Sequence, residues 1–187
     1  MAGTKARIRI ALVKMHCKDT DDNLGGDNVY MAGGIICDGR RTAILTYPTG
    51  ISDGQVIHLH QNEALVFQDE VLTTATIHVG IAAYREDFSK DWGKKYGPML
   101  KAMTRAVDSV TPPPDGAGRQ VIDAGEQART GIDGVFASDM VLGTLDFHIP
   151  VAELHGGEKL WCFKGSSGLR NWDYEVTYRI AKTANSD

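Results

Sequence analysis

Carboxylate side chains crowd a short segment near the N-terminus. Residues 19–27 read DTDDNLGGD, and Lys18 is the cation that directly adjoins them. Like charges at this density repel one another, and the repulsion is relieved by solvent, by raised pKa values or by a hard cation with oxygen ligands. A metal-binding loop and a solvated acidic turn both stay open on loop composition alone.

A second acidic segment follows a long apolar stretch. Residues 74–84 are rich in apolar and β-branched side chains, which predicts a strand, and Glu86, Asp87 and Asp91 come after it. The first acidic segment is also flanked by predicted strands, residues 7–15 before it and residues 29–37 after it. Carboxylates thus gather at two strand ends.

Further segments that predict β-strands follow along the rest of the chain. Asp38 and Gly39 suit the positive φ of a tight hairpin turn after residues 29–37. Residues 172–180 alternate cleanly between apolar and polar side chains, so their aromatic and aliphatic members are expected on one face. Other strands are predicted at residues 41–47, 55–60, 64–67 and 138–150.

Residues 92–137 carry a helical pattern instead. Met99, Met103 and Val107 recur at the spacing that places side chains on one side of a helix. The proline run in residues 111–116 ends this helix, and a weaker one is predicted over residues 120–131. We therefore expect a helical excursion of two helices between strands.

Composition and charge narrow the class of protein. The chain has 187 residues, 42% of them hydrophobic, which suits one globular domain. A formal net charge of -4 and the lack of a basic stripe argue against nucleic-acid binding. The sequence shows neither a run of 18 apolar residues nor a signal-peptide core. A cytoplasmic or peripheral membrane location is expected, and the three cysteines fit free thiols.

The order of these features resembles a C2 domain, a family of antiparallel β-sandwiches that bind calcium between loops at one end. Asp21 and Asp27 stand six residues apart in the first acidic loop, and Tyr30 follows. Residues 139–150 resemble the strand after the third loop of that family, with an acidic residue, an apolar pair, a glycine and a proline ending. The helical stretch departs from the family, because the third loop should be compact.

The resemblance implies a mainly β fold, a single C2-like domain over residues 1–187. It would be an antiparallel β-sandwich of about eight strands, with both terminal strands inside the sheets and a two-helix insertion at about residues 93–137. It also implies a calcium site, since calcium takes six to eight oxygen ligands from irregular loops. The implied metal ligands are Asp21, Asp27, Glu86, Asp87, Asp91 and Asp139.

The function implied is that of a non-enzymatic calcium-binding module. Its acidic loops would engage an anionic phospholipid membrane or a protein partner. A structural or self-assembly protein without calcium dependence is one alternative. A second is a cupin-like metal-dependent enzyme, because His58 and His60 alternate on a predicted strand before Glu63. No hydrolase, phosphate-loop or dinucleotide-binding motif occurs, and we expect no enzyme.

The first predicted helix is basic as well as amphipathic. Lys94, Lys95, Lys101 and Arg105 accompany its apolar side chains, directly after the second acidic segment. Such a helix is suited to an anionic membrane or a partner protein, while the plainer interpretation is that its apolar side covers the sandwich. Bound calcium would reverse the charge of the acidic loops and let these cations act with them.

Overall fold

The computed structural model describes residues 3–20, 26–59, 65–87, 91–111, 117–131, 136, 138–167 and 170–184. These residues form strands, two α-helices and one short 3₁₀ turn. The elements are β1 (Lys5–Asp19), β2 (Asp27–Cys37), β3 (Arg40–Leu45), β4 (Thr49–Ile51), β5 (Val56–His58), β6 (Leu65–Leu72), β7 (Thr76–Arg85), α2 (Trp92–Ser109), α3 (Gly118–Thr130), β8 (Met140–Pro150), η1 (Val151–Glu153), β9 (Gly157–Ser167) and β10 (Arg170–Ala184).

The strands form two antiparallel sheets. Sheet A has the order β5-β1-β10-β9, and β6 also pairs with β1. Sheet B has the order β3-β2-β7-β8, and β4 also pairs with β2. The terminal strands β1 and β10 pair at the centre of sheet A, with Ile10 opposite Ile180. Both terminal strands therefore lie inside the sandwich, as the sequence predicts.

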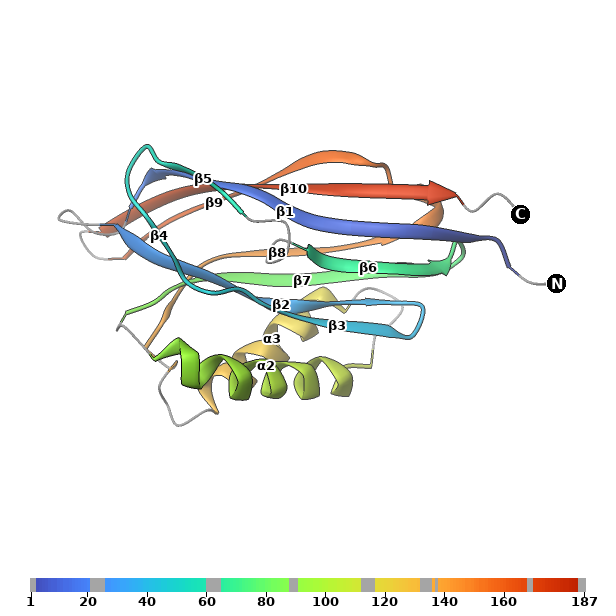
Figure 1. Ribbon diagram of the computed structural model, residues 1–187, viewed down its shortest axis with the longest axis horizontal. Coiled ribbons are helices and arrows are strands. Elements are labelled where there is room, and N and C mark those ends of the chain that lie inside the picture. Colours follow the sequence, from blue (N-terminus) through green and yellow to red (C-terminus); the bar gives the residue numbers. More distant parts are fainter. Residues whose placement is uncertain are drawn as a thin grey trace.

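Three layers are visible in Figure 1, with sheet A above sheet B and the two helices below sheet B. The main core lies between the sheets, because alternate side chains of a strand point to opposite faces. In β1, Ile8, Ile10 and Leu12 are buried while Arg7 and Arg9 are exposed. This alternation leaves the other face of sheet A to solvent.

Helices α2 and α3 cover the outer face of sheet B. Met99 and Met103 of α2 are buried there against Tyr30 and Tyr84 of the sheet. A side chain at Gly80 would place its Cβ 2.1 Å from the Gly118 carbonyl oxygen. Glycine at this position therefore lets α3 begin directly on β7.

The predicted antiparallel β-sandwich with a two-helix insertion is confirmed, and the insertion lies between β7 and β8. The Asp38 and Gly39 hairpin is confirmed too, with φ values of 50° and 73°. Two strands, β4 and β9, were not predicted from the sequence. β9 is an edge strand in which Trp161 and Phe163 are the buried side chains, so its alternation is too short to stand out.

Candidate cation site at the acidic end of the sandwich

Segments that are distant in sequence meet at one end of the sandwich, on the left of Figure 1. β1 ends there at Asp19, β2 begins there at Asp27, and Asp53 lies in the nearby turn after β4. β7 ends at the same edge, and β8 begins there after Asp139. We call this region the acidic end. The predicted carboxylates thus converge on one region, with Asp21 lying outside the described residues.

Asp27 occupies the side of sheet B that faces sheet A. Its strand neighbours Val29 and Met31 belong to the core between the sheets, and alternation points Asp27 the same way. Asp27 is only 3% exposed, and the Tyr174 hydroxyl donates a hydrogen bond to its Oδ2 atom at 2.5 Å. Burial, together with this hydrogen bond, raises the pKa of Tyr174 far above its ordinary value. The phenol is therefore a permanent donor at physiological pH.

Two more carboxylates lie around the same part of the acidic end. Asp53 Oδ1 accepts a hydrogen bond from the Thr20 backbone N–H at 2.6 Å, which ties the β4–β5 turn to the end of β1. Burial, and then the carboxylates of Asp53, Asp27 and Asp19, raise the pKa of the Cys17 thiol to about 11. These three aspartates form the group that we call the inner group. Asp53 was not predicted as a ligand, because its sequence neighbours read as an ordinary surface turn.

Asp139 lies on the opposite side of sheet B, toward the helices. The Tyr30 hydroxyl donates to Asp139 Oδ2 at 2.8 Å, and the Asp87 backbone N–H donates to Asp139 Oδ1 at 3.2 Å. Asp139 is 4% exposed. The pKa of Tyr30 is raised mainly by burial and secondly by the negative charge of Asp139. Asp139 therefore anchors the segment after β7 to the segment before β8.

The three carboxylates after β7 each contact a nearby donor. Glu86 Oε1 accepts from Trp92 Nε1 at 2.7 Å, and Asp87 pairs with Arg85 at 2.5 Å. Asp91 precedes α2 and pairs with Lys94 at 2.9 Å, with both side chains largely exposed. Asp87 and Glu86 belong with Asp139 to the second group of carboxylates, which we call the outer group. The predicted ligand set is thus divided between two faces of sheet B.

The donor chemistry suits calcium, while the number of ligands falls short. Calcium takes six to eight oxygens, and each carboxylate can accept several interactions beyond one hydrogen bond. Within the part of the chain that the structure describes, no group of three Asp, Glu, His or Cys side chains is arranged to hold a metal ion. The inner group would need further oxygens, such as those of Asp21.

Helix α3 carries an ion pair whose arginine is buried. Arg129 of α3 is 2% exposed and pairs with Glu126, while its guanidinium lies 4.6 Å from the centre of the Tyr84 ring. The Tyr84 hydroxyl donates to Glu126 Oε2 at 2.9 Å, and Arg129 Nη1 has no hydrogen-bond partner. Nothing in the sequence marks Arg129, since an arginine late in a helix usually faces solvent.

His58 of the cupin-like alternative does not enter the core. His58 is exposed on the short strand β5, opposite Lys14 of β1, and the fold is a two-sheet sandwich. His60 and Glu63 lie outside the described residues. His58 therefore does not point into a barrel, as that alternative would require.

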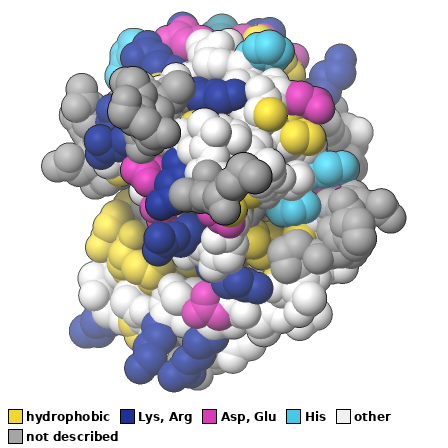
Figure 2. All heavy atoms as spheres, turned by 90° about the vertical axis from the view of Figure 1, so that its right-hand side faces the viewer, with side chains coloured by type: hydrophobic (Ala, Val, Ile, Leu, Met, Phe, Trp, Pro, Cys, Tyr) yellow, Lys and Arg dark blue, Asp and Glu magenta, His cyan; other side chains and the backbone are white. Residues whose placement is uncertain are grey.

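Helix α2 packs on the sandwich with its apolar side, which is the plainer of the two interpretations of its sequence. Its apolar side is buried on sheet B, which leaves Lys101 and Arg105 exposed. Lys and Arg side chains also gather in the lower part of Figure 2, over the helices. No helix among the described residues is both long and apolar enough to span a membrane.

No family model matches this sequence, and no curated protein sequence matches it. Among solved structures, the C2A domain of plant extended synaptotagmin 1 overlaps with a TM-score of 0.41 at 6% identity, covering 100% of this chain and 99% of that domain. Human GIVD cytosolic phospholipase A2 in complex with methyl gamma-linolenyl fluorophosphonate gives a TM-score of 0.41 at 14% identity. The match covers 100% of this chain, which spans 18% of the phospholipase chain. At these TM-scores the likeness does not bear on function. The two antiparallel sheets fit the C2-like β-sandwich that the sequence predicts.

Proposed function

We propose that the protein is a non-enzymatic calcium-binding module that engages a membrane surface or a protein partner through its acidic end. One observation carries the proposal: Asp19, Asp27 and Asp53 come from three separate segments that meet at the acidic end, where Asp53 accepts a hydrogen bond from the residue after Asp19 and Asp27 pairs with Ile51, two residues before Asp53. Three like charges brought together by a fold favour a cation in their midst.

The inner group is the part of the acidic end where a calcium ion would be held. Asp27 would be the central ligand, oriented by its hydrogen bond from Tyr174. Asp19 and Asp53 would add oxygens from the rim, and Asp21 is the predicted ligand nearest to them in sequence. The ion would supply positive charge to an end that otherwise repels anionic surfaces. Glu86, Asp87, Asp91 and Asp139 remain predicted ligands of a second position.

A calcium-independent structural module is the competing function. The observation that favours it is that Asp27 and Asp139 each accept a hydrogen bond from a buried tyrosine hydroxyl. Buried carboxylates that are satisfied in this way can serve the fold alone. The two functions differ in what calcium does to the stability of the folded protein.

Thermal unfolding of chelator-treated protein separates the two functions. A ligand that binds only the folded state, at a concentration of a hundred times its Kd, adds about 2.7 kcal/mol to the free energy of unfolding. For a chain of this size we expect a Tm increase of about 5–10 °C in millimolar calcium. Asp27→Asn should abolish the increase, while Asp108→Asn, an exposed aspartate on α2, should retain it. An unchanged Tm of the parent in calcium would leave the structural module as the function.

Engagement of a membrane is a second, separable part of the proposal. Lys101 and Arg105 are exposed on α2, and each basic side chain near an anionic bilayer contributes about 1 kcal/mol. We expect the protein to sediment with phosphatidylserine vesicles in calcium and to sediment less in chelator. Added salt should weaken the binding to the vesicles. Lys101→Glu with Arg105→Glu tests whether α2 takes part. Calcium binding without vesicle binding would point to a protein partner.

A further inference from the structure

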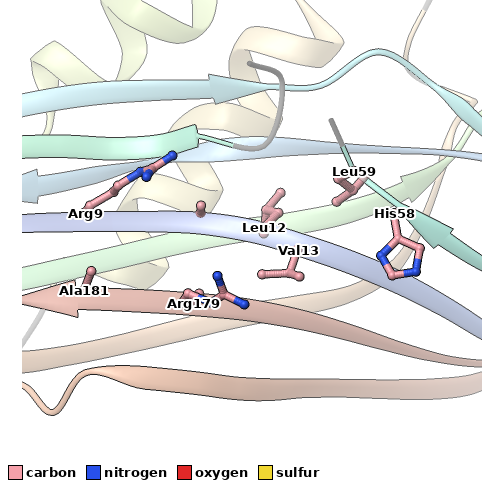
Figure 3. Close-up of a pocket in the computed structure, with 8 residues that line it drawn as sticks. Arg9, Leu12, Val13, His58, Leu59, Arg179 and Ala181 are labelled. Carbon is pink, nitrogen blue, oxygen red and sulfur yellow. The ribbon is translucent and has the colours of Figure 1, made fainter. Parts of the chain in front are cut away.

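A hollow of about 280 Å³ opens on the solvent face of sheet A, away from the acidic end and from the helices. Figure 3 shows it over β1, with β10 on one side and the end of β5 on the other. Its size is near the lower limit of small-molecule sites. The lining residues are Arg9, Ala11, Leu12, Val13, His58, Leu59, Arg179 and Ala181.

Short side chains on two neighbouring strands create the hollow. Charged residues occupy the outward positions of β1 up to Arg9, and the next outward positions carry Ala11 and Val13. Ala181 of β10 lies directly opposite Arg9 in the sheet register, and Arg179 lies opposite Ala11. Small apolar groups therefore form a floor that longer cationic side chains surround.

An irregularity in β1 widens this floor. The register between β1 and β10 shifts between Leu12 and Lys14, which makes Val13 an extra residue at a β-bulge. On the other edge of β1, β6 pairs only as far as Ala11, and β5 takes over at Lys14. The hollow thus lies where two partner strands leave β1 partly uncovered. Bulges of this kind often re-aim side chains near binding sites.

The charge around the hollow is positive in a chain whose formal net charge is -4. The side chains of Arg9 and His58 have no hydrogen-bond or ion-pair partner among the residues that the structure describes. Arg179 pairs with Glu158 at 2.5 Å, and Arg179 and Lys14 both act to lower the pKa of Glu158. Glu158 therefore offsets the charge of Arg179 and Lys14 in part, while the Arg9 side chain has no carboxylate paired with it among the described residues.

We propose that this hollow binds a small organic anion, a carboxylate or phosphate group attached to a short apolar body. The guanidinium groups of Arg9 and Arg179 offer planar pairs of donors that match either oxyanion. The floor of Ala11, Val13 and Ala181 would take the apolar body. None of these residues belongs to the acidic end, so binding here is independent of calcium and of the function proposed above.

Calorimetric titration of the full chain in chelator tests the proposal. The probes are benzoate and phenyl phosphate, with benzyl alcohol as the neutral comparison. We expect saturable binding of both anions, with benzyl alcohol at least tenfold weaker. Arg9→Gln should weaken both anions at least tenfold. Arg7→Gln, which removes the same charge two residues earlier on the same exposed face of β1, should change the affinity less than twofold.

A second variant tests the floor without altering charge. Ala181 is exposed, so Ala181→Leu should fill the hollow, keep the Tm of the parent and weaken benzoate at least tenfold. Equal losses in Arg7→Gln and Arg9→Gln would overturn the proposal, because they would show general attraction to a basic face. Absence of saturable binding by the parent, or equal affinity for benzyl alcohol, would overturn it as well.

Vesicles distinguish a soluble ligand from a lipid. Phosphatidylcholine vesicles containing phosphatidic acid are sedimented with the protein in chelator. Sedimentation that Arg9→Gln abolishes assigns the hollow to a lipid headgroup, and benzoate binding without sedimentation assigns it to a soluble acid. Sedimentation that Arg9→Gln and Arg7→Gln reduce equally counts against the hollow.

Discussion

Asp27 and Asp139 are two aspartates at the same end of the sandwich, almost equally buried and each hydrogen-bonded to a tyrosine hydroxyl. Their surroundings differ. Asp27 lies between the sheets, and its charge acts on the Cys17 thiol together with the charges of Asp19 and Asp53. Asp139 lies toward the helices, where the Arg129 charge acts on Tyr30 together with Asp139. We propose that the neighbours set the role of each carboxylate: further carboxylates would make Asp27 a cation ligand, and the arginine charge that acts on Tyr30 would make Asp139 a structural acceptor.

The largest expected effect concerns Arg129, the buried cation of α3. Arg129→Ala leaves Glu126 and Tyr84 without their buried partner, and we expect a loss of about 1.5–3 kcal/mol in the free energy of unfolding. Urea denaturation measures it. Arg119→Ala, which breaks an exposed pair with Asp123 on the same helix, should cost less than about 0.5 kcal/mol. Equal small losses would show that the buried pair does not stabilise the fold.

Removing each tyrosine hydroxyl sharpens the comparison. Tyr30→Phe and Tyr174→Phe each take one donor from a buried carboxylate, which costs about 1–3 kcal/mol. The same denaturation series in calcium then separates the groups. When variant and parent are both measured in calcium, the loss in Tyr174→Phe should be smaller than in chelator, because the ion adds positive charge beside Asp27, and the loss in Tyr30→Phe should be the same as in chelator. An equal change of the loss in both variants would contradict the distinction.

Neutralising the two aspartates in chelator should change stability in opposite directions. Asp27→Asn relieves repulsion within the inner group and is expected to stabilise the fold by on the order of 1 kcal/mol. Asp139→Asn weakens the acceptor of the Tyr30 hydroxyl and of the Asp87 backbone N–H and should destabilise by a similar amount. Both variants keep an oxygen acceptor for tyrosine. Destabilisation by Asp27→Asn would mean that the inner group is structural.

The smallest effect is a pH dependence that lies away from both groups. His78 Nδ1 accepts a hydrogen bond from the Ala117 backbone N–H at the start of α3, which requires a neutral imidazole. Burial, then the nearby His148, lowers the pKa of His78 below its ordinary 6.5. As pH falls below 6.5, the imidazole binds a proton in the unfolded chain before it does so in the folded chain. The free energy of unfolding therefore decreases as the pH falls.

Denaturation midpoints between pH 7.5 and 5 check this prediction. His78→Gln keeps an acceptor for Ala117 and should flatten the profile in this range, where most carboxylates are still ionised. An unchanged profile in His78→Gln would assign the pH dependence to other groups.

Local signals in the sequence were enough to predict much of the fold. The positive-φ turn at Asp38 and Gly39 and the helical spacing of Met99 and Met103 are properties of neighbouring residues, and both were found. The sequence also placed Asp27 and Asp139 at strand ends. It did not show that they face opposite sides of sheet B, because that depends on strand register and on which layer covers each face.

Other features depend on contacts between distant segments. Asp53 joins the inner group because β4 brings its turn beside the end of β1. Arg129 is buried because α3 starts directly on β7. The hollow beside Arg9 arises where β6 and β5 meet along β1. None of these positions carries a local sequence signal.

Calcium titration of chelator-treated protein by calorimetry tests the central claim most directly. The account predicts saturable binding by the parent, at least tenfold weaker binding by Asp27→Asn and unchanged binding by Asp108→Asn. Asp53→Asn, at the residue that the structure adds to the predicted set, should also weaken binding. Absence of saturable calcium binding by the parent, or equal affinity of the parent and Asp27→Asn, would contradict the account.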